Sequence, residues 1–174
     1  MDIEKSYDIT FIKTAVLEIA RQMYDDEFKP EYIAALSRGG LVPGVMLSHY
    51  LDIPLKTLSP DESNLWMAED AYGYIHGDER TPDNVGDHDM LFARNILIID
   101  DINDTGKTFK DVVDDWQSGC VPKSSHWNDV WHGNVKFAAL IHNEASEFTS
   151  DYVGKYINKN DNPEWCVFPW ERWW

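Results

Sequence analysis

Residues 95–109 read NILIIDDINDTGKTF, and this stretch decides both the fold and the site. The branched apolar residues Ile96 to Ile99 predict a buried strand. Two adjacent acids, Asp100 and Asp101, follow directly, and Asp104 to Thr108 then open a predicted helix. In open parallel sheets, ligands bind beyond the carboxyl ends of the strands. The stretch therefore predicts a binding site at the end of a central strand.

The residue types in this stretch indicate what the site binds. Neighbouring carboxylates cannot both be buried without partners, so Asp100 and Asp101 require hydroxyl donors or a hydrated divalent cation. A sugar diol would supply such donors. The free N–H groups of a helix start, its dipole, the threonine hydroxyls and the permissive backbone of Gly106 together form an anion site. A ribose with a 5-phosphate fits both halves of this pattern.

Two simpler interpretations compete for the same residues. Gly106-Lys107-Thr108 matches the end of the nucleotide P-loop pattern, but Asp101 stands where that pattern requires its first glycine. A carboxylate would then point to the place where backbone N–H groups surround phosphate, so we set this interpretation aside. A plain strand-to-helix turn capped by Asp104 would account for that acid. It would leave Asp100 and Asp101 unexplained.

The rest of the chain predicts alternating strands and helices. We expect strands at 32–36, 55–58, 95–99, 135–142 and 151–157, and helices at 11–25, 41–51 and about 106–117. Thr10 is the expected N-cap of the first helix. The strands are nearly continuous apolar runs, which is typical of a parallel sheet covered on both faces. We therefore predict an α/β fold, with a mostly parallel sheet flanked by helices.

The length of 174 residues favours a single domain, 1–174. Residues 59–93 are acidic, rich in Gly, Asp and Pro, and too long for a simple connection. We expect them to form a flap inserted into the domain. Residues 118–134 are expected to form a second long loop.

Composition excludes several classes of partner. The chain has 15 Lys and Arg against 31 Asp and Glu, a net charge of −16 that should repel nucleic acid and anionic membranes. No segment approaches the ~20 apolar residues of a membrane span, and the acidic start MDIEKSYDIT does not resemble a secretory signal. Cys120 and Cys166 match no disulfide or metal spacing. These features together predict a cytoplasmic protein.

Three blocks resemble one family, the type I phosphoribosyltransferases. The 95–109 stretch resembles their signature for phosphoribosyl pyrophosphate (PRPP), although Asn103 occupies a place that is usually apolar. The block ALSRGGLVPGVML (35–47) is similar to the pyrophosphate-binding segment of the bacterial xanthine-guanine phosphoribosyltransferases. The block DYVGKYINKNDNPEWCVFPWE (151–171) resembles the base-binding region of the same enzymes. The blocks also follow one another in the order of that family.

The resemblance implies a role for each matching residue. Asp100 and Asp101 would face the ribose hydroxyls and bound Mg²⁺, with Asp101 as a metal ligand. Asp104 would be catalytic, accepting a proton from the purine. The 5-phosphate would lie on the loop formed by Asp104, Thr105, Gly106, Lys107 and Thr108. The pyrophosphate would lie on Ser37, Arg38 and Gly39, and Arg80 in the 59–93 flap is a candidate for a further pyrophosphate contact.

The base-binding end departs from the family pattern. The resemblance implies that Trp165 stacks on the base and that the backbone at Cys166 reads its edge. In the bacterial enzymes a lysine after the strand equivalent to 135–141 reaches the purine 6-oxo group. Here His142 or Asn143 lies near that position, and neither carries the fixed charge of lysine at neutral pH. We assign His142 to base binding, and the choice of base stays open.

The resemblance implies a Mg²⁺-dependent enzyme of nucleotide salvage that transfers the phosphoribosyl group of PRPP to a guanine-, xanthine- or hypoxanthine-like base. The family resemblance also implies a homo-oligomer, either a dimer or a tetramer. One alternative is a PRPP or nucleotide sensor without turnover, and another is a transferase acting on a pyrimidine. Retention of Asp104 favours catalysis, since a sensor needs the phosphate cradle but no proton acceptor.

Overall fold

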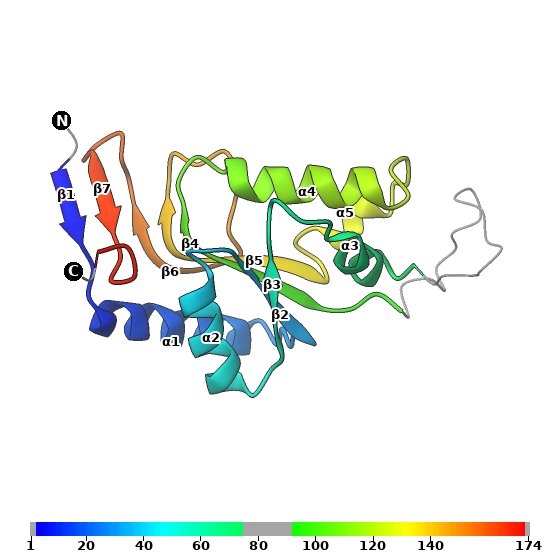
Figure 1. Cartoon of the computed structure of the whole chain (residues 1–174), viewed down its shortest axis with the longest axis horizontal. Coiled ribbons are helices and arrows are strands. Elements are labelled where there is room, and N and C mark those ends of the chain that lie inside the picture. Colours follow the sequence, from blue (N-terminus) through cyan, green and yellow to red (C-terminus); the bar gives the residue numbers. More distant parts are fainter. Residues whose placement is uncertain (1–2, 75–91, 173–174) are drawn as a thin grey trace.

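A computed structural model describes residues 3–74 and 92–172. Five of its strands form one sheet, which lies at the centre of the protein (Figure 1). The strand order is β3-β2-β4-β5-β6, and every neighbouring pair is parallel. The strands are β2 (Tyr32–Leu36), β3 (Leu55–Leu58), β4 (Ile96–Asn103), β5 (Val135–Asn143) and β6 (Tyr152–Ile157). The predicted fold class, a mostly parallel sheet flanked by helices, is confirmed.

Helices cover both faces of this sheet. On one face lie α1 (Ile9–Asp25) and α2 (Leu41–Leu51), and on the other lie α3 (Leu65–Tyr72), α4 (Lys107–Gly119) and α5 (Trp127–Val130) (Figure 1). The apolar run of β4 divides between the two faces. Leu97 and Ile99 pack with α1 and α2, whereas Ile96 and Ile98 pack with the aromatic residues beneath α4. A continuous apolar strand is thus needed because both of its faces are buried.

Two predicted boundaries are wrong by a few residues. Helix α1 begins at Ile9 and is capped by Asp8, whose Oδ1 accepts a hydrogen bond from Phe11 N at 2.8 Å, so Thr10 is not the cap. Strand β4 continues past residue 99 to Asn103, because β5 keeps pairing with it as far as His142. The acid pair therefore lies within the last residues of the strand.

The two long segments that we predicted as loops contain helices. Within 59–93, α3 buries Met67, Ala68, Ala71 and Tyr72, so residues 65–72 belong to the core and not to a flap. Within 118–134, the short α5 buries Trp127. The residues between 74 and 92, including Arg80, lie outside the described residues, and a flap there stays a prediction.

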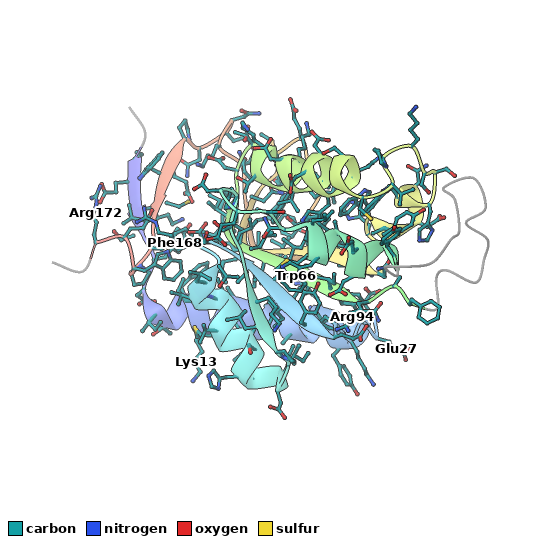
Figure 2. The ribbon with its side chains drawn as sticks, turned by 45° about the vertical axis from the view of Figure 1, so that its right-hand side comes forward. Lys13, Glu27, Trp66, Arg94, Phe168 and Arg172 are labelled. Carbon is teal, nitrogen blue, oxygen red and sulfur yellow. The ribbon has the colours of Figure 1, made fainter. Side chains whose placement is uncertain are left out.

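A two-stranded parallel sheet joins the beginning of the described chain to its end. It consists of β1 (Ile3–Ser6) and β7 (Glu164–Val167), which lie side by side in Figure 1, and it was not predicted. Buried Glu164 accepts hydrogen bonds from Tyr7 Oη at 2.9 Å and Lys5 Nζ at 3.3 Å. Arg172, labelled with Phe168 beside this sheet in Figure 2, pairs with Glu4. No helix within 3–74 or 92–172 is long and apolar enough to cross a membrane.

Candidate active site

The side chains of Asp100 and Asp101 lie next to each other near the end of β4, where burial makes their charged forms unfavourable. The backbone N–H of Asp101 donates to Asp100 Oδ1 at 2.8 Å. Burial raises the pKa of Asp100 well above its usual range, and the charge of Asp101 adds to this rise. Burial also raises the pKa of Asp101. Hydrogen bonds with the Asp100 side chain and with the Ile102 backbone make this rise smaller. A bound hydroxyl or cation would relieve this cost.

The Ser37–Gly40 turn packs directly against these acids. It follows β2, and Ser37 N donates to Leu58 O at 3.0 Å while Gly40 N donates to Leu36 O at 2.9 Å. A Cβ atom on Gly39 would lie 2.1 Å from Asp101 Oδ2, so a larger residue there would have to displace this carboxylate. The Arg38 side chain is exposed, and the Ser37–Arg38 peptide bond is cis. The structure thus brings together the residues predicted for pyrophosphate and for the ribose.

The 104–108 loop forms the other side of the site. Gly106, with φ 87°, is the N-cap of α4, and Lys107 N bonds to Thr105 Oγ1 at 3.3 Å. The side chains of Thr105, Lys107 and Thr108 are exposed, and Lys107 forms an ion pair with Asp111 on the next turn. A cavity of about 240 Å³ is lined by residues 100–109. The 104–108 loop and the acid pair therefore line the same cavity.

We expect Gly106→Ala to strain this loop. An alanine would need the left-handed φ of 87°, and its Cβ would lie 2.7 Å from the backbone nitrogen of Phe148. The free energy of unfolding should fall by about 1–3 kcal/mol, as measured by urea denaturation, and PRPP should bind more weakly in calorimetry. Gly119→Ala is the control, because its new Cβ would meet only Leu65 Cδ1 at 3.4 Å. Equal stability of the two variants would contradict a constrained loop.

Asp104 is held by residues from two other segments. Asn143 Nδ2, at the end of β5, lies 3.0 Å from Asp104 Oδ1, and Lys159 Nζ lies 2.7 Å from Asp104 Oδ2. Lys159 follows β6 and is 55 residues away in the sequence. Sequence reasoning missed Lys159, because a lysine in a polar turn carries no pattern that distinguishes it. Asn143 had been considered only as an alternative to His142.

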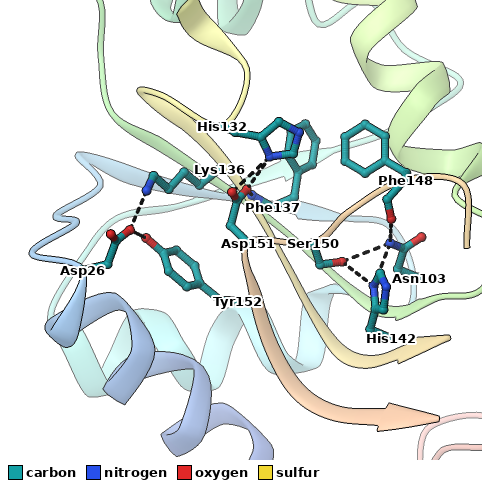
Figure 3. A network of polar contacts seen from close by, with 10 residues as sticks. All are labelled: Asp26, Asn103, His132, Lys136, Phe137, His142, Phe148, Ser150, Asp151 and Tyr152. Atoms are coloured by element: carbon teal, nitrogen blue, oxygen red, sulfur yellow. Dashed lines mark hydrogen bonds and ion pairs between the residues drawn. The ribbon is translucent and has the colours of Figure 1, made fainter. Parts of the chain in front are cut away.

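His142 lies in a buried polar network (Figure 3). It is 8% exposed, and its Nδ1 lies 3.1 Å from both Asn103 Nδ2 and Ser150 Oγ. Asn103 Nδ2 also donates to Phe148 O at 2.7 Å, so that nitrogen is a donor and His142 Nδ1 is an acceptor. Burial lowers the pKa of His142, in agreement with a neutral ring. The network explains the polar Asn103 in a place usually apolar. A role of His142 in base binding stays a prediction.

Trp165 and Cys166 occupy strand β7. The Trp165 side chain is 56% exposed, whereas its neighbours Glu164 and Cys166 are buried. Burial raises the pKa of the Cys166 thiol to about 11, with the charge of Lys159 opposing the rise and that of Asp104 adding to it. Strand β7 therefore carries an aromatic side chain that is more than half exposed.

Comparison with known proteins places this arrangement in a family. The family model of the phosphoribosyl transferase domain matches residues 4–171. The purine phosphoribosyltransferase of Pyrococcus horikoshii Ot3 is 27% identical, with a TM-score of 0.61 over 99% of this chain and 96% of that chain. The xanthine-guanine-hypoxanthine phosphoribosyltransferase of Helicobacter pylori has the same fold, with 20% identity and a TM-score of 0.61 over 98% and 94% of the two chains. The resemblance inferred from the sequence is confirmed, and the chain belongs to the phosphoribosyl transferase domain family as a phosphoribosyltransferase enzyme.

Proposed function

We propose that this enzyme transfers the 5-phosphoribosyl group of PRPP to a purine base of the guanine, xanthine or hypoxanthine type and releases pyrophosphate. One observation carries the proposal: the acid pair lies between the 37–40 turn and the 104–108 loop, with Gly39 against the Asp101 carboxylate. Three parts of one donor molecule would thus find their partners at a single sheet edge. The likeness to a purine phosphoribosyltransferase supports a purine acceptor.

Each part of PRPP has matching groups. The 5-phosphate would accept hydrogen bonds from the exposed loop 104–108 at the start of α4, where the helix dipole favours an anion. The ribose hydroxyls would donate to Asp100 and Asp101. The pyrophosphate would lie on the Ser37–Gly39 turn, with the exposed Arg38 guanidinium as its counter-charge.

Asp100 and Asp101 also suit Mg²⁺. Carboxylate oxygens are preferred Mg²⁺ ligands, and such sites are commonly completed by substrate phosphates and water. Burial raises the pKa of both acids, so their charged forms are costly, and a divalent cation would reduce that cost. When bound, the metal would stabilise the negative charge that develops on the departing pyrophosphate.

In the proposed reaction, a residue of this chain takes up the proton that the base loses. A ring nitrogen of the base forms a bond to C1 of the ribose while the C1–O bond breaks, and pyrophosphate leaves with the electron pair. The proton lost by the base passes to the Asp104 carboxylate. Trp165 offers an exposed ring on which the base can stack, and the backbone at Cys166 would read its edge. A salvage role in the cytoplasm and assembly into a dimer or tetramer complete the proposal.

Incubation with PRPP, Mg²⁺ and a panel of bases would test this function, with pyrophosphate release as the readout. We expect turnover with guanine, hypoxanthine or xanthine, and none without a base. Turnover with a pyrimidine alone would overturn the purine assignment. If the protein bound PRPP tightly but turned over none of the bases, the result would favour a PRPP sensor over a transferase.

A further inference from the structure

Both carboxylate oxygens of Asp104 accept hydrogen bonds from side chains of other segments, one at the end of strand β5 and one in the turn after β6. Asn143 Nδ2 lies 3.0 Å from Oδ1, and Lys159 Nζ lies 2.7 Å from Oδ2. The second contact is charge-assisted and therefore the stronger of the two. A carboxylate has about four lone-pair positions, so two remain for a substrate proton. Asp104 is thus held in one orientation while it stays able to accept.

The orientation of the Asn143 carboxamide follows from its surroundings. Its Oδ1 accepts from Ala145 N at 3.3 Å and from Lys159 N at 3.1 Å. The N–H groups of Ala145 and Lys159 both need an acceptor, so the carboxamide oxygen of Asn143 must face them and its Nδ2 group must face Asp104. Nδ2 also donates to the backbone oxygen of Asp104 at 3.1 Å. Asn143 is buried, and it joins the turn that carries Lys159 to the 104–108 loop.

The Lys159–Asp104 ion pair is not an ordinary surface pair. The Lys159 side chain is 19% exposed and that of Asp104 is 39% exposed, so the lysine is largely covered while the carboxylate still reaches solvent. A surface lysine loses much side-chain entropy when it forms an ion pair. Here the covered stem and the backbone bond to Asn143 have already fixed its position. Asp104 also lines the cavity of residues 100–109, from which a substrate would arrive.

We propose that Asn143 and Lys159 are positioning residues, which hold the Asp104 carboxylate in the orientation that takes the proton from the incoming base. This inference rests on the proposed function, in which Asp104 is the proton acceptor. Proton transfer requires hydrogen-bond reach, and a misplacement of about 1 Å costs on the order of 100-fold in rate. Neither residue needs to touch the base for this role.

Substitutions of Lys159 and Asn143 should have different effects on kcat and on the KM for PRPP. Lys159 Nζ contacts the Asp104 carboxylate, so Lys159→Met should lower kcat by about 10- to 100-fold and change the KM for PRPP less than about twofold. Lys159→Arg should restore most of kcat, because arginine retains the charged donor. Asn143→Ala also removes the donor to the Asp104 backbone oxygen, so it should lower kcat and raise the KM for PRPP together.

Lys136→Met is the matched control. Lys136 is 18% exposed and also forms an ion pair with an aspartate, Asp26, but it lies at the opposite end of β5 (Figure 3). The kcat of the Lys136→Met variant should equal that of the unmutated enzyme. The proposal is overturned if Lys159→Met and Asn143→Ala keep kcat within about twofold, or if Lys136→Met loses as much as Lys159→Met.

A second measurement needs no turnover. A double-mutant cycle of Asp104→Ala with Lys159→Met, followed by urea unfolding, should show non-additivity of at least about threefold in the unfolding constant. Additive effects would show that Asp104 is not held and would overturn the inference. Failure of every base in the panel would refute the proposed function, whereas the cycle would still decide whether Lys159 holds Asp104.

Discussion

Asp104→Asn should lower kcat by about 10²- to 10⁴-fold, the range expected when a positioned proton acceptor is lost. The amide keeps the size of the side chain and one acceptor oxygen but cannot take a proton. The dissociation constant of PRPP should change little, because the substitution leaves in place the backbone N–H groups of the 104–108 loop and the helix start, to which the 5-phosphate would bind. Steady-state kinetics with the accepted base and calorimetry with PRPP measure the two effects.

Asp114→Asn is the control for this variant. Asp114 lies on the exposed side of α4 and does not line the cavity of residues 100–109, but it lines a second cavity together with Asp104, so the substitution removes the same charge nearby. Its kcat should stay within about twofold of the unmutated enzyme. If Asp104→Asn weakened PRPP binding as much as it lowered kcat, Asp104 would be a binding residue and not the proton acceptor.

Asp100→Asn should inactivate the enzyme and at the same time stabilise it. If Asp100 faces the ribose and Mg²⁺ as proposed, loss of its carboxylate should lower kcat/KM by about 10²-fold or more. The free energy of unfolding at pH 7 should rise by about 0.5–2 kcal/mol, since a buried charge beside Asp101 disappears. Unfolding in urea between pH 4 and pH 8, with kinetics at pH 7, tests both parts.

The pH dependence has a definite sign. Because the pKa of Asp100 in the folded state is raised above the unfolded value of 3.8, its stabilising contribution is present below pH 3.8 and is lost as the pH rises through the folded pKa. The advantage of Asp100→Asn should therefore grow with pH over this window. Asp26→Asn is the opposite control: the hydrogen bond from Lys136 lowers the pKa of Asp26, so that variant should lose stability at neutral pH. A variant at Asp100 that is less stable than the parent at pH 7 would contradict the account.

The sequence alone predicted those parts of the candidate site whose residues are close together in the chain or directly follow a strand. The apolar run of β4, the acids that follow and the Thr-Gly-Lys-Thr loop lie within 95–109, and the end of a parallel strand places them at one edge. The Ser37–Gly39 turn was predicted for the same reason, because it follows β2, the strand beside β4. The role of each of these residues stays a prediction.

The unpredicted parts depend on contacts between distant segments. Lys159 contacts Asp104 across 55 residues, and nothing in a polar turn specifies such a contact. Helix α3 is short and surrounded by acids, so its apolar residues span too few turns to show a clear period. The cap of α1 was misplaced because Asp8 and Thr10 are both good capping residues, and only backbone geometry distinguishes them.

The pairing of β1 with β7 has a consequence for the order of assembly. Their side-chain contact between Lys5 and Glu164 joins residues that are 159 positions apart, and closing so long a loop costs more entropy than pairing the inner strands. The five-stranded sheet is therefore expected to form earlier during folding. At that stage the residues proposed to bind the sugar phosphate would already be assembled, whereas Trp165, proposed to stack on the acceptor base, would not yet be held in β7.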